Sequence, residues 1–210
     1  MIDVTEQINS VRRTLGDRVL EAGTARVLTI SQSYDTDLDD LWDVVTVPER
    51  IERWFLPVSG ELREGGKYQF EGNAGGTVTR CDRPRSFAAT WEFGGQVSWI
   101  EVRLTPEAGG RTRFVLEHTA HVDDHWDTYG PGAVGVGWDS GLLGLAMHLG
   151  APDTPRDTDA IMAWMGSADG KRFMWLSSQA WAEASVAAGV DPATAEKQAA
   201  ATYAAYTGGE

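Results

Sequence analysis

Histidine is the residue type in this sequence best suited to chemistry near neutral pH, because its ordinary pKa is about 6.5. Three of the four histidines lie close together, at His118, His121 and His125, and His148 stands apart. A metal ion needs ligands that converge on one point, yet residues three apart on a strand face opposite sides. We therefore expect no metal site; only a helical turn could bring His121 and His125 together.

The other reactive side chains give weaker signals. Cys81 is the only cysteine and has no histidine near it in sequence, so we interpret it as structural rather than nucleophilic. Aspartates at positions 35, 37 and 39 imitate the start of a calcium loop, but Asp40 and Thr46 stand where that loop needs glycine and glutamate. Negative charge at a helix start accounts for these aspartates. No nucleophile elbow or phosphate-binding glycine loop occurs, so we predict neither a catalytic residue nor a cofactor.

Length and composition limit the classes of function. A chain of 210 residues, 42% hydrophobic and 23% charged, fits one soluble domain with some additional helices. Acidic residues outnumber basic ones 31 to 18, and a net charge of −13 disfavours nucleic acids and anionic membranes as partners. The sequence has no apolar run of about 18 residues that could span a bilayer, and its amino terminus does not resemble a signal peptide. We expect a cytoplasmic location.

The elements that position these side chains follow from the spacing of apolar residues. Residues 4–20 carry apolar side chains at helical spacing and predict an amphipathic leading helix, whereas residues 27–34 predict a strand. Two short helices follow, the second opened by Pro48. From 61 to 119 the period changes to two between turn signals, which predicts an antiparallel meander. A long helix with one apolar stripe is expected after Pro131, and then three further helical segments.

The meander can be registered from its clearest turn. Gly94-Gly95 suits a two-residue hairpin, and counting outward from it pairs Trp91 with Ser98. Pairing of the next strand sets His118 beside Ser98, so we expect these two polar residues side by side on an otherwise apolar face. Such a pair can orient the carbonyl or hydroxyl of a ligand. The alternative is a buried histidine that is hydrogen-bonded to a neighbour.

A series of short motifs carries a family resemblance through its order and spacing. The motifs are Leu41-Trp42, Thr46-Val47-Pro48-Glu49 with Trp54-Phe55-Leu56-Pro57, Gly65-Gly66-Lys67-Tyr68, residues 78–84, Leu116-Glu117-His118-Thr119 and Gly137-Trp138. Together they resemble the family of activators of the heat-shock-protein ATPase, which belongs to the START-related, birch-pollen-allergen-like helix-grip superfamily. The resemblance covers about residues 26–150. It implies an α+β helix-grip fold, in which a curved antiparallel sheet of about seven strands wraps around the long C-terminal helix, with additional N- and C-terminal helices.

The resemblance also implies a domain plan and a cavity. It predicts an N-terminal amphipathic helix over 1–24, a helix-grip domain over 25–150, and a helical extension over 151–210 packed on that domain. Relatives hold lipids, sterols, hormones or polyketides between the sheet and the long helix. The residues expected to line such a cavity here are Trp54, Phe70, Trp91, Ser98, Phe114, His118, Trp138 and Leu142. The same aromatic residues would also suit a filled core, and the sequence leaves both alternatives open.

Three hypotheses for the function follow. The first is a non-enzymatic binder of a small hydrophobic or aromatic molecule, in which Ser98 and His118 provide direction. The second is an enzyme of the polyketide cyclase or aromatase type, with His118 as general acid or base. The third is a co-chaperone-like module, which an exposed patch around Trp99 or the tail helices would favour. We expect no chaperone partner, because the amino-terminal domain of eukaryotic co-chaperones is not seen here, and we leave a homodimer open.

Overall fold

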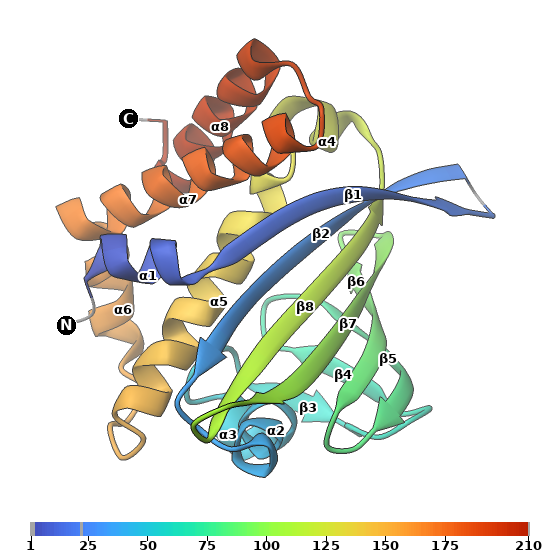
Figure 1. The fold of residues 1–210 in the computed structure, drawn as a ribbon, viewed down its shortest axis with the longest axis vertical. Helices are drawn as coiled ribbons and strands as arrows, with labels where there is room; N and C mark the ends of the chain where they lie inside the picture. The colour runs from blue at the N-terminus through green and yellow to red at the C-terminus, as the bar shows by residue number, and fades with distance from the viewer. Residues whose placement is uncertain (1–2, 22, 210) are drawn as a thin grey trace. The chain divides into compact units, whose positions relative to one another are not determined.

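The computed structural model describes residues 3–21 and 23–209. Its strands and helices are largely segregated along the chain, as in an α+β protein (Figure 1). In sequence order they are α1 (Val4–Ser10), β1 (Arg12–Leu20), β2 (Gly23–Tyr34), α2 (Leu38–Thr46), α3 (Pro48–Ile51), β3 (Val58–Gly60), β4 (Lys67–Phe70), β5 (Gly75–Asp82), β6 (Ser86–Phe93), β7 (Gln96–Glu107), β8 (Arg111–His121), α4 (Asp124–Tyr129), α5 (Gly132–Gly150), α6 (Thr158–Met165), α7 (Ala168–Ala187) and α8 (Pro192–Thr207).

The strands form one eight-stranded antiparallel sheet in the order β1-β2-β8-β7-β6-β5-β4-β3. This order confirms the α+β helix-grip class. The meander, the two short helices and the long helix after Pro131 all occur where the sequence predicts them. Asp37 caps α2 by accepting a hydrogen bond from the backbone of Asp40, so this aspartate serves a helix start and not a calcium loop.

The prediction of one leading helix over residues 4–20 is wrong in its second half. The helix ends at Ser10, and Arg12–Leu20 forms β1, which supplies the eighth strand. Val4 and Ile8 are buried and hold the helical part. From Val11 to Leu15 the burial alternates with a period of two, and residues 16–19 are exposed. Gly16 would also weaken a helix interior, so an extended strand is preferred there.

The chain divides into two compact units. The first, called the helical unit here, comprises residues 1–30, 121–143 and 157–210, and the second, the sheet unit, comprises residues 31–120 and 144–156. Both β2 and α5 continue from one unit into the other. The three-part domain plan expected from the sequence stays a prediction.

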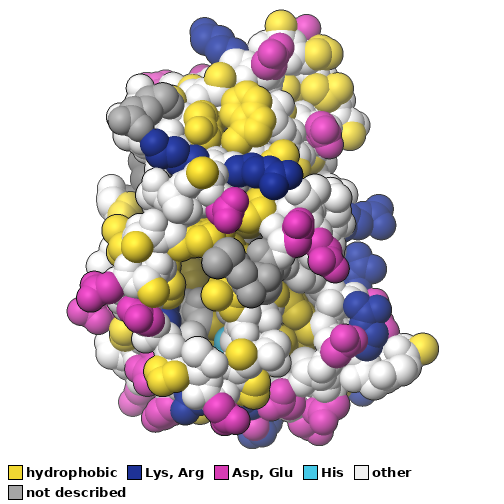
Figure 2. Space-filling view, turned by 90° about the vertical axis from the view of Figure 1, so that its left-hand side faces the viewer, with side chains coloured by type: hydrophobic (Ala, Val, Ile, Leu, Met, Phe, Trp, Pro, Cys, Tyr) yellow, Lys and Arg dark blue, Asp and Glu magenta, His cyan; other side chains and the backbone are white. Residues whose placement is uncertain are grey.

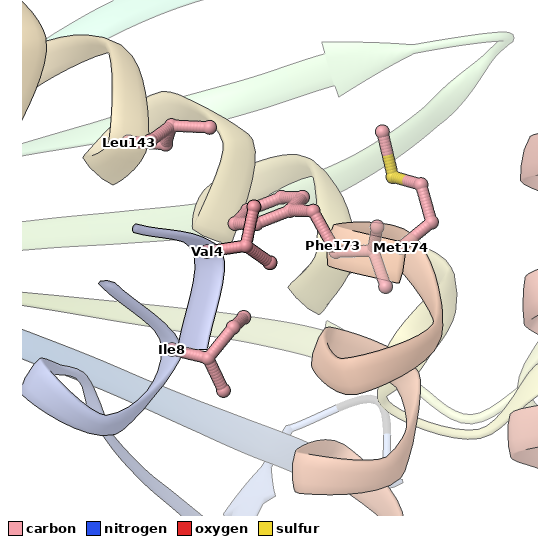
Figure 3. Packing of buried hydrophobic residues seen from close by; sticks show 6 residues of the cluster. Val4, Ile8, Leu143, Phe173 and Met174 are labelled. Atoms are coloured by element: carbon pink, nitrogen blue, oxygen red, sulfur yellow. The ribbon is translucent and has the colours of Figure 1, made fainter. Parts of the chain in front are cut away.

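The helical unit has its own hydrophobic core. Val4 and Ile8 of α1, Val136 and Leu143 of α5, and Phe173 and Met174 of α7 are all buried in one cluster. Figure 3 shows the Phe173 ring directed toward Val4. Helices α7 and α8 lie side by side (Figure 1), and α7 also contacts α1, α6 and β1. The C-terminal helices therefore have apolar partners of their own within this unit.

A buried ion pair lies within the helical unit. Asp139 of α5 is 1% exposed, and Arg13 of β1 binds it through two hydrogen bonds, from Nη2 to Oδ1 at 2.7 Å and from Nε to Oδ2 at 3.0 Å. Ser177 and Trp181 of α7 also donate to Oδ2, at 2.5 and 3.0 Å. The carboxylate thus joins β1, α5 and α7 by four hydrogen bonds.

The sheet unit is packed on the short helices α2 and α3. Leu41, Val44 and Val45 of α2 and Ile51 of α3 are buried, as are the inward side chains of β7 and β8. The α2 helix contacts β7, and α3 contacts β3. These helices cover one end of the strands (Figure 1), and they place Trp54 and Phe55 next to the sheet.

The surface has the acidic character that the composition indicates. Figure 2 shows acidic side chains spread over the face that it presents, together with basic and hydrophobic ones. The expectation that polyanions are poor partners, which rests on the net charge of −13, stays a prediction. Within the described residues, none of the helices has the length and apolar character needed to cross a bilayer.

Candidate functional site

A row of aromatic rings runs through the sheet unit from α3 toward β8. The ring centroids of Trp54 and Phe55 are 5.5 Å apart, and those of Phe55 and Phe70 are 5.1 Å apart. Phe70 of β4 then contacts Trp91 of β6 at 5.7 Å, and Trp91 contacts His118 of β8 at 6.3 Å. Trp54, Phe55, Phe70 and Trp91 are only partly buried. The row therefore presents large flat apolar groups without forming a closed core of its own.

Backbone contacts fix the end of the row that lies on α3. The Trp54 indole N–H donates to the carbonyl of Val44 at 3.0 Å, which anchors the ring on α2. The Trp54 carbonyl packs directly against Gly144 of α5, where a Cβ atom would overlap it. Glycine at this position lets the C-terminal part of α5 approach the loop after α3.

His118 and Ser98 form a hydrogen-bonded pair at the other end of the row. The Nε2 atom of His118 lies 2.8 Å from the Ser98 Oγ, and this Oγ donates to the Trp91 carbonyl at 3.0 Å. The His118 side chain is buried, at 2% exposure. The pair is thus held by β6, β7 and β8 together, as the sequence predicts.

The predicted register of β7 and β8 is wrong by two residues. The prediction places His118 opposite Ser98, but the structure pairs His118 with Ile100. The two strands extend to Glu107 and Arg111 around a tighter turn than expected. Each residue of β7 therefore pairs with a residue of β8 two positions further along than predicted. A shift of two keeps each side chain on its own face, so Ser98 and His118 become diagonal neighbours and still meet. The predicted pairing of Trp91 with Ser98 is confirmed.

Burial governs the electrostatics of this pair. Loss of hydration lowers the pKa of His118 to about 4, because a charged imidazolium is unfavourable in an apolar surrounding. The imidazole is therefore neutral at pH 7. The Ser98 hydroxyl has two partners, the Trp91 carbonyl at 3.0 Å and His118 Nε2 at 2.8 Å, and the donor in the second contact depends on the tautomer of the imidazole.

The remaining predicted lining residues are Phe114, Trp138 and Leu142. Phe114 of β8 is 3% exposed and belongs to the packed core of the sheet unit. Trp138 and Leu142 are on the part of α5 that belongs to the helical unit, where Leu142 is buried and Trp138 partly so. Their membership in a ligand site stays a prediction. Phe55 was missed as a member of the aromatic row, although its place next to Trp54 in the sequence was a usable signal.

The other histidines are not assembled into a site with His118. His121 ends β8, whereas His125 lies on α4, with its ring 4.7 Å from that of Tyr129. His148 of α5 is 5% exposed, and burial together with Arg50 and Arg53 lowers its pKa. Among residues 3–21 and 23–209, no three His, Cys, Asp or Glu side chains are grouped so that they could hold a metal ion.

These features define a helix-grip protein whose sheet carries partly buried aromatic rings and one neutral polar pair. The model of the family described as activator of Hsp90 ATPase homolog 1-like protein matches residues 35–150, which is more than half of the chain. The chain belongs to this family.

Solved structures extend the likeness beyond the matched region. The crystal structure of CalU16 from Micromonospora echinospora is 34% identical, with 83% of this chain and 97% of that chain covered and a TM-score of 0.63. The solution structure of CalU16 gives the same identity, coverage of 85% and 97%, and a TM-score of 0.69. MLL2253 from Mesorhizobium loti, 20% identical, covers 61% of this chain and 100% of its own at a TM-score of 0.54, and shows the fold alone. No curated protein matches the sequence.

Proposed function

We propose that this protein binds a small, mostly apolar or aromatic molecule against the aromatic row of the sheet, without catalysing a reaction. The observation that carries the proposal is the His118–Ser98 hydrogen bond at the end of a row of partly buried rings. Flat rings supply contact area, and a single fixed polar pair supplies orientation, which is the usual composition of a small-molecule site. Membership in a helix-grip family supports the same reading.

The electrostatics of His118 favour a binder over a cyclase-like enzyme. A general acid or base works best when its pKa lies near the operating pH. The pKa of His118 is lowered to about 4, so it has no imidazolium proton to give at pH 7 and is a weak base. The Trp91 carbonyl also competes with His118 for the proton of Ser98, which disfavours activation of that hydroxyl as a nucleophile.

The binding hypothesis can be tested through tryptophan fluorescence. The probe is N-phenyl-1-naphthylamine, an uncharged aromatic amine. We expect it to quench the tryptophan emission of the protein, and we expect Trp91→Phe to remove part of that quenching. Trp175→Phe on α7 is the matched control, because Trp175 is 42% exposed and contacts Tyr203 in the helical unit. His118→Ala should weaken binding by about tenfold at most. Turnover of a bound compound that His118→Ala abolishes would replace the binder with the enzyme.

Exposed hydrophobic side chains favour a co-chaperone-like module as the second candidate. Trp99 is 36% exposed and Val97 45%, and both point to the face of β7 opposite to Ser98. A surface of this kind can serve protein contacts. The name of the family supplies the assay, which is the rate of ATP hydrolysis by a heat-shock ATPase with and without this protein. Stimulation that Trp99→Ser removes, with no small molecule bound, would establish the second candidate in place of the first.

A further inference from the structure

A small cavity lies in the helical unit, where α8 packs on α7 and on α4 (Figure 1). Tyr129, Ser178, Ser185 and Gln198 are among its lining residues, and all of the lining belongs to this unit. Its volume is about 10 Å³. A cavity of roughly 10–15 Å³ holds one water molecule, whereas a drug-sized ligand needs about 300 Å³ or more. The size therefore restricts the occupant to a molecule as small as water.

The Ser185 hydroxyl belongs to this lining and has no partner among the described residues. Ser185 lies on α7 and is 1% exposed, and its Oγ atom is buried without a hydrogen bond. Ser178, the other serine of the lining, donates from its Oγ to the Met174 carbonyl at 2.8 Å within the helix. Ser185 does not use the corresponding intrahelical acceptor. Because a hydroxyl is hydrogen-bonded to water in the unfolded chain, burying it without a partner is unfavourable.

A second polar side chain of the lining comes from α8. The Nε2 atom of Gln198 faces the carbonyls of Trp126 and Asp127, at 3.4 and 3.2 Å. These contacts use the N–H groups of the amide, so its Oε1 atom can accept from another donor. A buried water needs about two to four polar partners. Ser185 on α7 and Gln198 on α8 provide one polar side chain from each of the two helices.

We propose that this cavity is a binding site for one water molecule, which hydrogen-bonds to the Ser185 Oγ and to Gln198 and so joins α7 to α8. An apolar occupant would leave the Ser185 hydroxyl without a partner, whereas water can both donate and accept. The inference is independent of the proposed function, because the cavity belongs to the helical unit and the aromatic row to the sheet unit.

The water extends a polar stripe of α8. Gln198, Thr202 and Tyr206 follow one another at intervals of four and therefore share one face of the helix. Thr202 donates to the Tyr129 carbonyl at 2.9 Å, and Tyr206 donates to the Ala133 carbonyl at 3.0 Å. These bonds lead from α8 to the backbone of α4 and of the start of α5. The water adds a polar link from the same stripe to α7.

The test is nuclear magnetic resonance of the parent protein with ¹³C-labelled alanine methyl groups. Ala195 and Ala199 line the cavity and are 2% and 4% exposed, so bulk water hardly reaches their methyl groups. We expect rotating-frame cross-peaks between water and these methyl groups. The methyl group of Ala25, which is 0% exposed on β2, is the control and should show none. Absence of cross-peaks at both Ala195 and Ala199 overturns the inference.

Substitutions assign the water to Ser185. Ser185→Ala should remove the water cross-peaks, whereas Ser178→Ala, at the other serine of the lining, should keep them. In urea unfolding, Ser185→Ala should lower the equilibrium constant for folding about 2- to 12-fold, which is the range for one net hydrogen bond. A hydroxyl without any partner would give the opposite sign, because its removal relieves the cost of burial. An increase in stability, or cross-peaks that persist in Ser185→Ala, therefore overturns the inference and leaves the proposed function standing.

Discussion

Replacement of Asp139 by asparagine is the most direct test of how the helical unit is held together. Asparagine has the shape of aspartate, so the packing around α5 is kept while the charge is removed. The amide would keep its oxygen at the Oδ2 position, where Arg13, Ser177 and Trp181 all donate. Its NH₂ group would then face the Nη2 of Arg13, which now donates to Oδ1. Two N–H donors, the Arg13 guanidinium and the new amide, would then face each other without an acceptor.

The expected cost follows from burial. Arg13 and Asp139 side chains are 6% and 1% exposed, so water cannot replace the lost partner. Removing one member of a buried ion pair leaves the other charge uncompensated, which costs about 3–5 kcal/mol. For a protein of this size that corresponds to a fall in Tm of roughly 6–20 °C. The exposed pair of Asp17 with Arg26 gives the contrast, because such surface pairs contribute about 0–1 kcal/mol.

The assay is urea unfolding followed by circular dichroism, for the parent, Asp139→Asn and the control Asp17→Asn. A double variant, Arg13→Met with Asp139→Leu, removes both charges and should recover only part of the stability, because the buried donors of Ser177 and Trp181 then lose their acceptor at about 1–3 kcal/mol each. If Asp139→Asn unfolds within about 1 kcal/mol of the parent, the buried pair does not stabilise the helical unit and this reasoning is refuted.

Three further predictions concern stability. Gly135→Ala would drive a Cβ atom into the Trp181 ring and should cost about 1–3 kcal/mol in urea unfolding, whereas Gly150→Ala meets nothing and should be neutral. Because the pKa of His118 is lowered to about 4, the folded protein binds fewer protons than the unfolded chain between pH 6.5 and about 4. Lowering the pH through this window should therefore reduce the free energy of unfolding by roughly 3 kcal/mol. The reduction should be smaller in His118→Phe. His148→Leu should unfold no earlier than the parent, because neither buried ring nitrogen of His148 has a hydrogen-bond partner among the described residues; a loss above about 2 kcal/mol would contradict this.

Local sequence patterns predicted most of the fold, and they failed in β1, where apolar residues at helical spacing lie in a strand. Turn glycines and a period of two gave the meander, and the Gly94-Gly95 hairpin gave the correct pairing of β6 with β7. Val11, Leu15 and Val19 are spaced by four, which suits a helix, but the strand β1 contains all but the first of them. Strand formation there depends on partners distant in the sequence, and a periodicity cannot reveal such partners.

The candidate site was predictable for a different reason. Side chains on a strand alternate, so an error of two residues in the β7–β8 register left His118 on the correct face and within reach of Ser98. The ion pair of Arg13 with Asp139 was not predictable in this way. Its members are 126 positions apart, and Arg13 lies in β1, where the sequence predicts a helix.

Asp139 and the Ser98–His118 pair are two buried polar groups that differ in their charge and in the number of their hydrogen bonds. Asp139 accepts four donors, all of them from this chain, so its negative charge is used in joining β1, α5 and α7. The Ser98–His118 pair carries no charge at pH 7, and Ser98 joins it to the backbone carbonyl of Trp91. We therefore expect substitution of Asp139 to change unfolding more than binding of an aromatic probe, and Ser98→Ala to change binding more than unfolding.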